Sequence, residues 1–398
     1  MSANTASAAR GSGAENAGPS ADRIADALAR TFALWRDRNY AGPRDAIAAI
    51  ARSAGYSLAM LENSIDALLK PFTGEALRAM AGTAARPTVD RPKTIGFIAA
   101  GNVAGAGIHE IAIALICGAR VTIKTASAGP VFFAEFARTL DEIDGDVGAR
   151  IEVVHWNRTR TDLTDELLAN CERVVAYGDD ATIESLHRPN VIGFGSRVSA
   201  ALIAGDAIIP SRIDEIADLL VRDVVLFEQL GCLSLHQVFV VSPDDRAPRE
   251  LAIRMSAALE RSANAMPPAR IPTRDAAEIR GVRERARWRA IAGEPVELFE
   301  GRGLEWTVVF EPKADSFKVS PGFRTVHVAG VRDLAEFRDC VAGVSGRIEA
   351  IAVVGDDCEI EARAMGIPYV CAPGEMQSPP LDWRHGGGGF IDMMVGSR

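Results

Sequence analysis

Residues 94–124, which read TIGFIAAGNVAGAGIHEIAIALICGARVTIK, decide the fold of the first half of the chain. Residues 95–99 form the short apolar run of a buried strand, residues 108–117 are apolar over the length of a helix, and residues 121–124 read as a second strand. Strand, glycine-rich turn, helix and strand make a βαβ unit, the arrangement in which open sheets bind nucleotides and other ligands. The sequence therefore predicts a parallel sheet that can bind a ligand.

The glycines of this turn, Gly101, Gly105 and Gly107, have the spacing GxxxGxG. The dinucleotide fingerprint is GxGxxG, so the ordinary phosphate grip of a dinucleotide-binding domain is not predicted. A turn that needs glycine only for close packing explains the spacing equally well.

Helices and strands alternate along most of the remaining chain. Residues 21–85 carry apolar side chains at helical spacing, prolines 87 and 92 mark a linker, and strand-like and helical segments alternate beyond residue 124. Such alternation predicts an α/β fold with parallel sheets covered by helices. We expect a disordered tail at residues 1–20, a cofactor-binding α/β domain with N-terminal helices at 21–195, a catalytic α/β domain at 196–372, and a segment at 373–398 that packs back on the first domain.

The composition excludes several classes of function. The 398 residues carry a net charge of −9, so a sequence-independent nucleic-acid binder, which needs a basic surface, is excluded. Residues 1–20 lack the apolar segment of a signal peptide or anchor, and polar residues interrupt the apolar stretch 95–123, so we expect a cytoplasmic protein with no membrane span. No two of the six cysteines lie within twelve residues of each other, and the six histidines show no ligand spacing, so no metal site is expected.

Three residues of the first predicted domain are candidates for a ligand site. Asn102, Lys124 and Gly178 each lie at the end of a predicted strand or just after it. Ligands of parallel sheets bind beyond the carboxyl ends of the strands, so these residues should line one crevice. If they do not bind a ligand, Asn102 is an ordinary turn residue and Lys124 is a solvated lysine at the end of a strand.

A second informative stretch, residues 227–236, reads FEQLGCLSLH. A helical run precedes it and a strand follows it, so Gly231 and Cys232 fall where the chain changes direction. A lone cysteine on such a turn is typical of a nucleophilic thiol, although a buried packing cysteine is the alternative. A thiolate is stabilised by a nearby cation, and His236 is the nearest candidate. A histidine satisfied by the backbone at the start of the strand is the other interpretation of His236.

Three tracts together resemble the aldehyde dehydrogenase superfamily and, within it, the acyl-CoA reductase family of the bacterial luminescence fatty acid reductase (the LuxC family). They are FEQLGCLS at 227–234, SPGFRTV at 320–326, and the ending GEM at 374–376 with PPLDWRH at 379–385. The resemblance extends from about residue 21 to residue 395 and implies an aldehyde dehydrogenase-like fold.

The resemblance also implies roles for single residues. Cys232 would be the nucleophile that carries the acyl group, and the Asn102 amide would help to hold the oxyanion of the thiohemiacetal. Cofactor contacts are implied for Lys124, at the adenosine ribose, and for three further positions that match cofactor loops or the Glu-Leu-Gly-Gly-Lys motif of the superfamily. These are Gly178, Ser196 and Arg197.

Gly193 departs from the superfamily pattern, because hydrolytic aldehyde dehydrogenases place a glutamate base there. An enzyme that oxidises aldehydes uses such a carboxylate to activate the water that hydrolyses its acyl-enzyme. A reductase instead needs the acyl-enzyme to survive until hydride arrives. We therefore expect Cys232 to attack an acyl-CoA and release CoA, and the acyl-enzyme to be reduced to a thiohemiacetal that collapses to the aldehyde.

Cofactor, donor and partners are implied only by the resemblance. It favours NADPH, with NADH as the alternative, a medium or long fatty acyl chain, and a homo-oligomer that works with acyltransferase or synthetase subunits. A reductase of acyl-protein or acyl-phosphate donors fits the same nucleophile. A silent partner subunit of an acyl-transferring complex is a third hypothesis, against which the presence of Cys232 and Asn102 argues.

Overall fold

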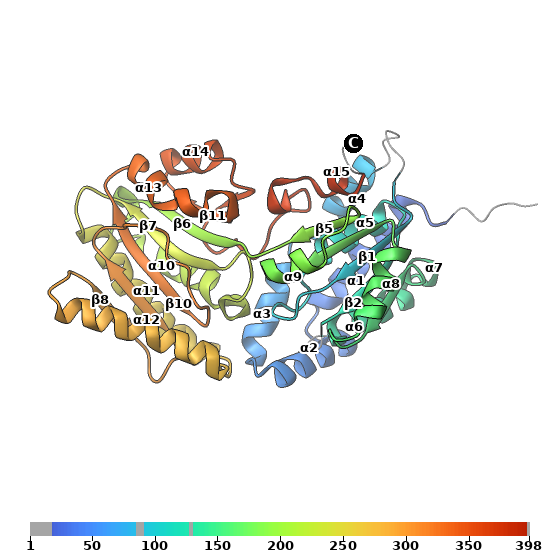
Figure 1. Cartoon of the computed structure of the whole chain (residues 1–398), viewed down its shortest axis with the longest axis horizontal. Coiled ribbons are helices and arrows are strands. Elements are labelled where there is room, and N and C mark those ends of the chain that lie inside the picture. The colour runs from blue at the N-terminus through green and yellow to red at the C-terminus, as the bar shows by residue number, and fades with distance from the viewer. Residues whose placement is uncertain (1–17, 85–90, 127–129, 396–398) are drawn as a thin grey trace, which may run out of the picture.

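The computed structural model describes residues 18–84, 91–126 and 130–395, and it contains two sheets, each with its own helices, side by side (Figure 1). This arrangement confirms the predicted α/β class. The tail predicted at residues 1–20 lies outside the described residues except for 18–20, and Pro87 of the predicted linker also lies outside them.

Four helices open the described chain and pack around the first sheet. The hydroxyl oxygens of Ser20 and Ser57 cap two of them by accepting hydrogen bonds from backbone N–H groups of the first turn. One helix ends at Gly55, whose φ of 73° suits glycine. The helices are α1 (Ala21–Arg36), α2 (Ala41–Ala54), α3 (Leu58–Leu69) and α4 (Gly74–Ala84).

The first sheet has the strand order β3-β2-β1-β4-β5, and all its strands are parallel. The order reverses between β1 and β4, which is the switch point where open α/β sheets bind ligands. The strands are β1 (Thr94–Ile98), β2 (Arg120–Thr125), β3 (Ile151–His155), β4 (Arg173–Tyr177) and β5 (Val191–Phe194). The helices between them are α5 (Ile108–Ile116), α6 (Pro130–Ile143), α7 (Gly145–Gly148), α8 (Thr161–Asn170) and α9 (Asp180–Ser185).

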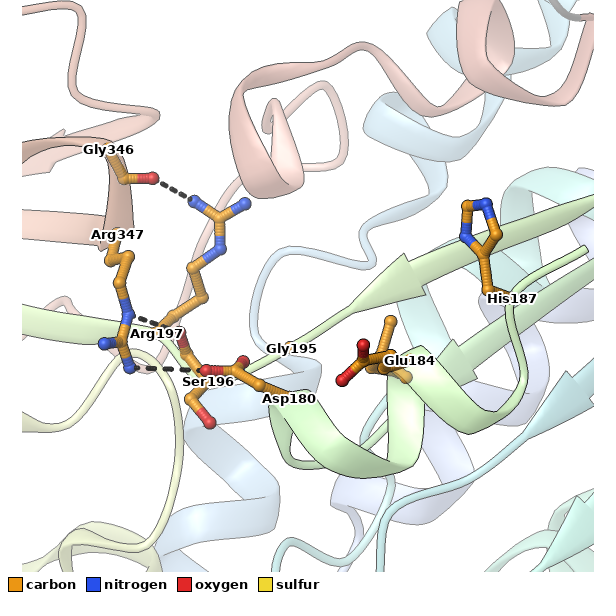
Figure 2. A pocket seen from close by; sticks show the side chains of 9 residues that line it. Asp180, Glu184, His187, Gly195, Ser196, Arg197, Gly346 and Arg347 are labelled. Atoms are coloured by element: carbon orange, nitrogen blue, oxygen red, sulfur yellow. Dashed lines mark hydrogen bonds and ion pairs between the residues drawn. The ribbon is translucent and has the colours of Figure 1, made fainter.

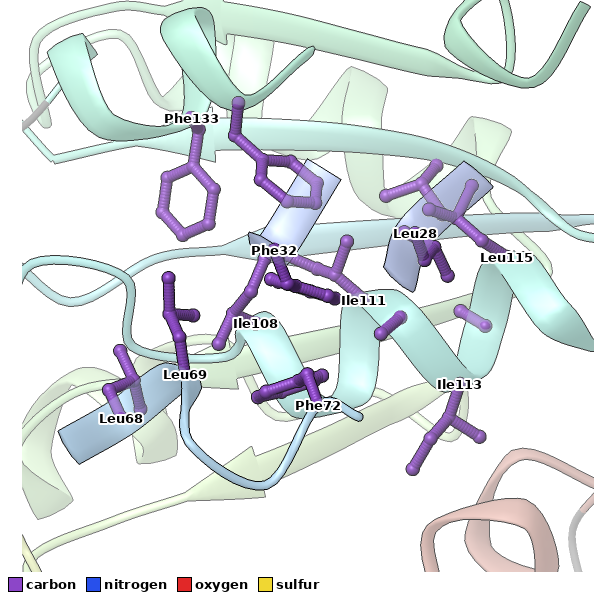
Figure 3. Close-up of a cluster of buried hydrophobic side chains, with 14 of the residues drawn as sticks. Leu28, Phe32, Leu68, Leu69, Phe72, Ile108, Ile111, Ile113, Leu115 and Phe133 are labelled. Carbon is purple, nitrogen blue, oxygen red and sulfur yellow. The ribbon is translucent and has the colours of Figure 1, made fainter. Parts of the chain in front are cut away.

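Helix α5 lies at the centre of the first core, and all nine of its residues are buried. Leu28 and Phe32 pack on it from α1 and Phe72 from the loop between α3 and α4, with Phe133 from α6 close by (Figure 3). Burial of each such side chain is worth about 1.5–3 kcal/mol, so this cluster fixes the position of the first sheet. Helix α5 is mostly apolar, but no helix among the described residues is long and apolar enough to cross a membrane.

The second sheet has the order β12-β11-β6-β7-β10-β9-β8 and is parallel except for the β8–β9 pair. Apolar clusters cover both of its faces. Its strands are β6 (Val198–Ala204), β7 (Leu235–Val241), β8 (Glu297–Glu300), β9 (Thr307–Glu311), β10 (Thr325–Val331), β11 (Ile348–Val354) and β12 (Tyr369–Cys371). Its helices are α10 (Ile213–Val225), α11 (Arg246–Ala265), α12 (Thr273–Ile291), α13 (Leu334–Val341) and α14 (Asp356–Ala364), with short 3-10 turns η1 (Gly205–Ala207), η2 (Leu226–Gln229) and η3 (Ala342–Arg347).

The chain crosses between the two sheets twice. Residues 195–197 join β5 directly to β6, so the carboxyl edge of the first sheet faces the second domain. Residues 372–389, which we call the returning segment, then lead from β12 back to the first domain and include η4 (His385–Gly387). Helix α15 (Phe390–Val395) follows and packs on α5. Both connections therefore lie between the two sheets.

Candidate active site

Cys232 lies in the turn between η2 and β7, where the backbone is strained. Phe227, Glu228 and Gln229 have φ values of 53°, 52° and 63°, a left-handed conformation that favours glycine. Each such residue costs on the order of 1–3 kcal/mol and persists only where its surroundings hold it. The contacts of this turn therefore determine where the thiol lies.

A buried ion pair holds the first part of the turn. Arg324 donates two hydrogen bonds to the Glu228 carboxylate, at 3.0 and 2.7 Å, and the two side chains are 0% and 1% exposed. Phe323 and Arg324 are left-handed as well, and the Phe323 N–H donates to the Glu228 carbonyl. Burial raises the pKa of Glu228, and the Arg324 charge opposes that shift. The tract at 320–326 thus supports the turn that carries Cys232.

The amide of Gln229 fastens the second part of the turn. Its oxygen accepts a hydrogen bond from the Thr325 N–H at 2.8 Å, and its nitrogen donates to the carbonyls of Leu235 and Thr325 at 2.6 and 2.7 Å. Ser320 also donates to the Gln229 oxygen. These bonds lock the turn to the starts of β7 and β10.

Cys232 itself is partly exposed, unlike the buried cysteines at 171, 340 and 358. Its carbonyl accepts a hydrogen bond from the Ser199 hydroxyl at 2.7 Å, and that hydroxyl accepts one from the Ala350 N–H. The Gly231 N–H donates to the Ser234 hydroxyl. A partly exposed thiol on an anchored backbone is compatible with a nucleophile, although Cys232 also packs against the apolar cluster of the second sheet.

Asn102 lies against the same turn. Its side-chain nitrogen donates to the Leu230 carbonyl at 2.6 Å, and its own carbonyl accepts from the Tyr56 hydroxyl at 3.3 Å. Burial and the Glu228 charge raise the pKa of Tyr56 to about 12, so this hydroxyl stays protonated. A primary amide has a second N–H, which leaves Asn102 a donor for a ligand beside Cys232.

His236 faces away from Cys232. Its Nδ1 accepts a hydrogen bond from the Ser320 N–H at 3.0 Å, and its ring lies beside Phe317. Burial lowers the pKa of His236 to about 4, so the ring is neutral at pH 7. The hydrogen bond and the ring contact of His236 within the described ranges are with Ser320 and Phe317, so the structure does not bring the predicted His236–Cys232 pair together.

His385, from the returning segment, is the imidazole that interacts with Cys232. The His385 ring stacks on the Phe194 ring, with 3.9 Å between the ring centroids, and on the Trp383 ring, with 4.3 Å between the centroids. Its Nδ1 lies 2.7 Å from a Glu110 carboxylate oxygen. Burial alone would lower the pKa of His385, but the Glu110 charge and a hydrogen bond with Cys232 raise it to about 10. Sequence reasoning missed this histidine because no spacing links residues 232 and 385.

Glu110 and Tyr177 complete the cluster. Although burial opposes it, the charge and hydrogen bond of His385 lower the pKa of Glu110 to about 2, so Glu110 and His385 form an ion pair at neutral pH. Burial, with the charges of Glu110 and Cys232, raises the pKa of Tyr177 well above its usual value. The Tyr177 hydroxyl is buried and lies beside Glu110.

Lys124 lies at the carboxyl end of β2, as predicted for a ligand contact. The ammonium is partly buried, burial lowers its pKa, and no ion-pair partner for it is found within the described ranges. A half-buried cation without a carboxylate partner can bind a polar or anionic ligand. Gly178 directly follows β4, and a Cβ there would lie 2.9 Å from the Thr182 side chain, so glycine lets α9 approach the end of the strand.

Ser196 and Arg197 lie in the connection between the sheets. The Ser196 N–H donates to Asp180 and its carbonyl accepts from Arg347, while Arg197 donates to the Gly346 carbonyl and lies 3.7 Å from the Glu349 carboxylate. A cavity of about 450 Å³ opens between this connection, α9 and residues 346–347 (Figure 2). Its size is in the range of small-ligand sites.

The described residues contain no group of three or more His, Cys, Asp or Glu side chains that could hold a metal ion.

The fold matches that of solved aldehyde dehydrogenases. An NAD-dependent benzaldehyde dehydrogenase from Corynebacterium glutamicum aligns with a TM-score of 0.69 and 17% identity, over 95% of this chain and 84% of that one. An NADP-dependent glyceraldehyde-3-phosphate dehydrogenase from Bacillus halodurans, complexed with NADP, aligns with a TM-score of 0.64 and 15% identity, over 89% of this chain and 79% of that one. The chain therefore has the aldehyde dehydrogenase-like fold that the three sequence tracts implied.

Comparison of the sequence with family models shows which family the chain belongs to. The family model of the acyl-CoA reductase LuxC matches residues 17–395, so the chain belongs to this family, as the resemblance suggested. A curated relative, the long-chain acyl-protein thioester reductase of Aliivibrio fischeri, is 24% identical over 255 residues, which are 62% of this chain. The match spans 50% of the length of that relative.

Proposed function

We propose that this protein reduces a long-chain acyl thioester to the aldehyde through an acyl group carried on Cys232. The observation that carries the proposal is the partly exposed Cys232 on a rigid turn, with the Asn102 amide bonded to the same turn. Membership in the LuxC family supports it.

Each of these residues would have a separate role in the reaction. The Cys232 sulfur attacks the thioester carbonyl and expels the donor thiol, while the Asn102 amide and the Cys232 N–H stabilise the negative oxygen. A bound nicotinamide dinucleotide would supply hydride, and Lys124 is the residue that would hold its ribose or phosphate. After reduction, the thiohemiacetal on Cys232 collapses to aldehyde and regenerates the thiolate.

Gly193 explains why the acyl-enzyme would survive. A Cβ at this position would lie 2.4 Å from the Ile183 side chain, so α9 occupies the space that a glutamate side chain would need. A carboxylate base for hydrolysis therefore does not fit at residue 193 unless the Ile183 side chain moves. The reaction we propose is reductive rather than hydrolytic for this reason.

The donor is an acyl thioester of either CoA or a protein. The family description names an acyl-CoA reductase, whereas the Aliivibrio fischeri relative is named for an acyl-protein thioester. Both donors present the same carbonyl to Cys232. The cofactor is NADPH or NADH, because one structural neighbour with this fold is NAD-dependent and another is NADP-dependent.

A donor competition assay tests the proposal. Wild-type protein and Cys232→Ser are mixed with reduced cofactor and, in turn, a long-chain acyl-CoA, an acyl carrier protein thioester and an acyl phosphate, and aldehyde is measured by chromatography. We expect aldehyde from at least one thioester with wild type and none with Cys232→Ser. Failure of every thioester donor would overturn the proposal and favour a silent partner subunit.

A further inference from the structure

The returning segment places one ring against the nucleophile and fixes it on several sides. The His385 ring is sandwiched between Phe194, with an interplanar angle of 9°, and Trp383, with an angle of 19°. Glu110, on the buried helix α5, holds Nδ1 at 2.7 Å. The ring also has a hydrogen bond with the Cys232 side chain, and because Nδ1 is held by Glu110 we assign this second bond to Nε2.

The next residue of the segment is held just as firmly. The Gly386 N–H donates to the buried Glu349 carboxylate at 3.0 Å, and its carbonyl accepts from Arg197. Gly386 has a φ of 66°, and a Cβ there would lie 3.1 Å from the Arg197 guanidinium and 3.3 Å from the Phe194 ring. The chain that carries His385 is therefore locked to the sheet connection, and the ring cannot swing away from Cys232 without breaking these contacts.

We propose that His385 is the proton donor and acceptor of the acyl-transfer step at Cys232, and that Glu110 is the residue that positions it. The inference rests on the proposed function and deepens it. Cysteine, imidazole and carboxylate stand in the order of a catalytic triad, with the third member supplied by a helix of the other domain.

The protons and bonds balance as follows. The Cys232 thiolate forms a bond to the acyl carbon, and the bond from that carbon to the donor sulfur breaks. The donor leaves as a thiolate and takes the proton from Nε2 of His385. In the reverse direction, neutral His385 accepts the proton of an incoming thiol. Glu110 keeps its negative charge throughout and orients the ring through Nδ1. The raised pKa of His385 keeps the proton in place at neutral pH until the donor leaves.

The role of His385 can be separated from a structural one by changing the leaving group. An alkyl thioester such as acyl-pantetheine releases a basic thiolate that needs a proton. A nitrophenyl thioester releases a weakly basic thiolate that leaves without one. Acid catalysis typically contributes about 10²–10⁴-fold, so only the alkyl thioester should lose that factor in a variant that lacks the acid.

The experiment measures single-turnover acylation of wild type, His385→Gln, Glu110→Gln and Glu110→Asp with both thioesters, without reductant. We expect His385→Gln to be slowed about 100-fold or more on the alkyl thioester and less than about tenfold on the nitrophenyl thioester. Glu110→Gln should show the same selectivity more weakly, and Glu110→Asp should restore part of the loss. His236→Gln, the matched histidine control, should change the alkyl-to-aryl ratio less than twofold.

Equal slowing of both thioesters by His385→Gln would overturn this inference, because it would mean that the residue only supports the structure. Retained alkyl activity in His385→Gln would overturn it too. If wild type were acylated by neither thioester, the proposed function itself would fail, and this outcome is distinct from the other two.

Discussion

Replacing Arg324 with methionine would leave the Glu228 carboxylate buried without its cation. The pair is bidentate and its side chains are 0% and 1% exposed, and removal of one partner from such a pair costs about 3–5 kcal/mol. The remaining contact of the carboxylate, the Ala269 N–H at 3.2 Å, is too weak to offset this cost. Since the pair also holds left-handed residues on both sides, we expect Cys232 to be displaced as well.

Urea denaturation followed by tryptophan fluorescence would measure the loss. Arg324→Met should lower the free energy of unfolding by about 3–5 kcal/mol, while the double variant with Glu228→Leu should lose less, because both charges are gone. Arg36→Met, which breaks a half-exposed ion pair with Asp66, serves as the control and should cost less than about 1 kcal/mol. Strictly additive effects of Arg324→Met and Glu228→Leu, or a loss below about 1 kcal/mol for Arg324→Met, would refute the argument.

Three further predictions follow from the site. Asn102→Ala should slow acylation of Cys232 about 10²–10³-fold, as the loss of one oxyanion donor does, and an unchanged rate in stopped-flow assays would contradict that role. Lys124→Met should raise the KM of the reduced cofactor about tenfold or more with little change in kcat, because a charged hydrogen bond is worth about 1.5–3 kcal/mol; an unchanged KM would remove Lys124 from the cofactor site. The stability difference between wild type and His385→Gln should be largest between pH 4.5 and 6.5. It should fall toward pH 10, where His385 with its raised pKa loses its proton, and toward pH 2, where Glu110 with its lowered pKa gains one; thermal unfolding across this range checks both signs, and a difference that does not change with pH would argue against the ion pair.

The first sheet could be predicted from the sequence because its signals are local. The buried strand, the glycine turn and the apolar helix of residues 94–124 occupy consecutive positions, and the structure contains β1, α5 and β2 there. The turn at Cys232 was predictable for the same reason, since helix and strand patterns meet at Gly231.

His236 shows where local reasoning fails. It is close to Cys232 in sequence, but side chains alternate between the faces of a strand. Leu235 packs in the same apolar cluster as Cys232, so the next residue, His236, points to the opposite face and meets Ser320. Sequence distance was therefore a poor measure of distance in space.

His385 and Glu110 could not have been paired from the sequence. They meet only because the chain returns from β12 to the first domain, and no periodicity encodes that path. The left-handed backbone at Phe227, Glu228 and Gln229 was equally hidden, since none of these residue types favours it. Both features depend on long-range contacts that a pattern of local residues does not contain.

Intact-protein mass spectrometry tests the central claim, that Cys232 carries the acyl group, most directly. Wild type and Cys232→Ala are mixed with a long-chain acyl-CoA or acyl carrier protein thioester, and reduced cofactor is added afterwards. The account predicts one acyl adduct on wild type alone, which disappears as aldehyde when NADPH or NADH is supplied. An equal adduct on Cys232→Ala, or no adduct on wild type with either donor, would contradict it.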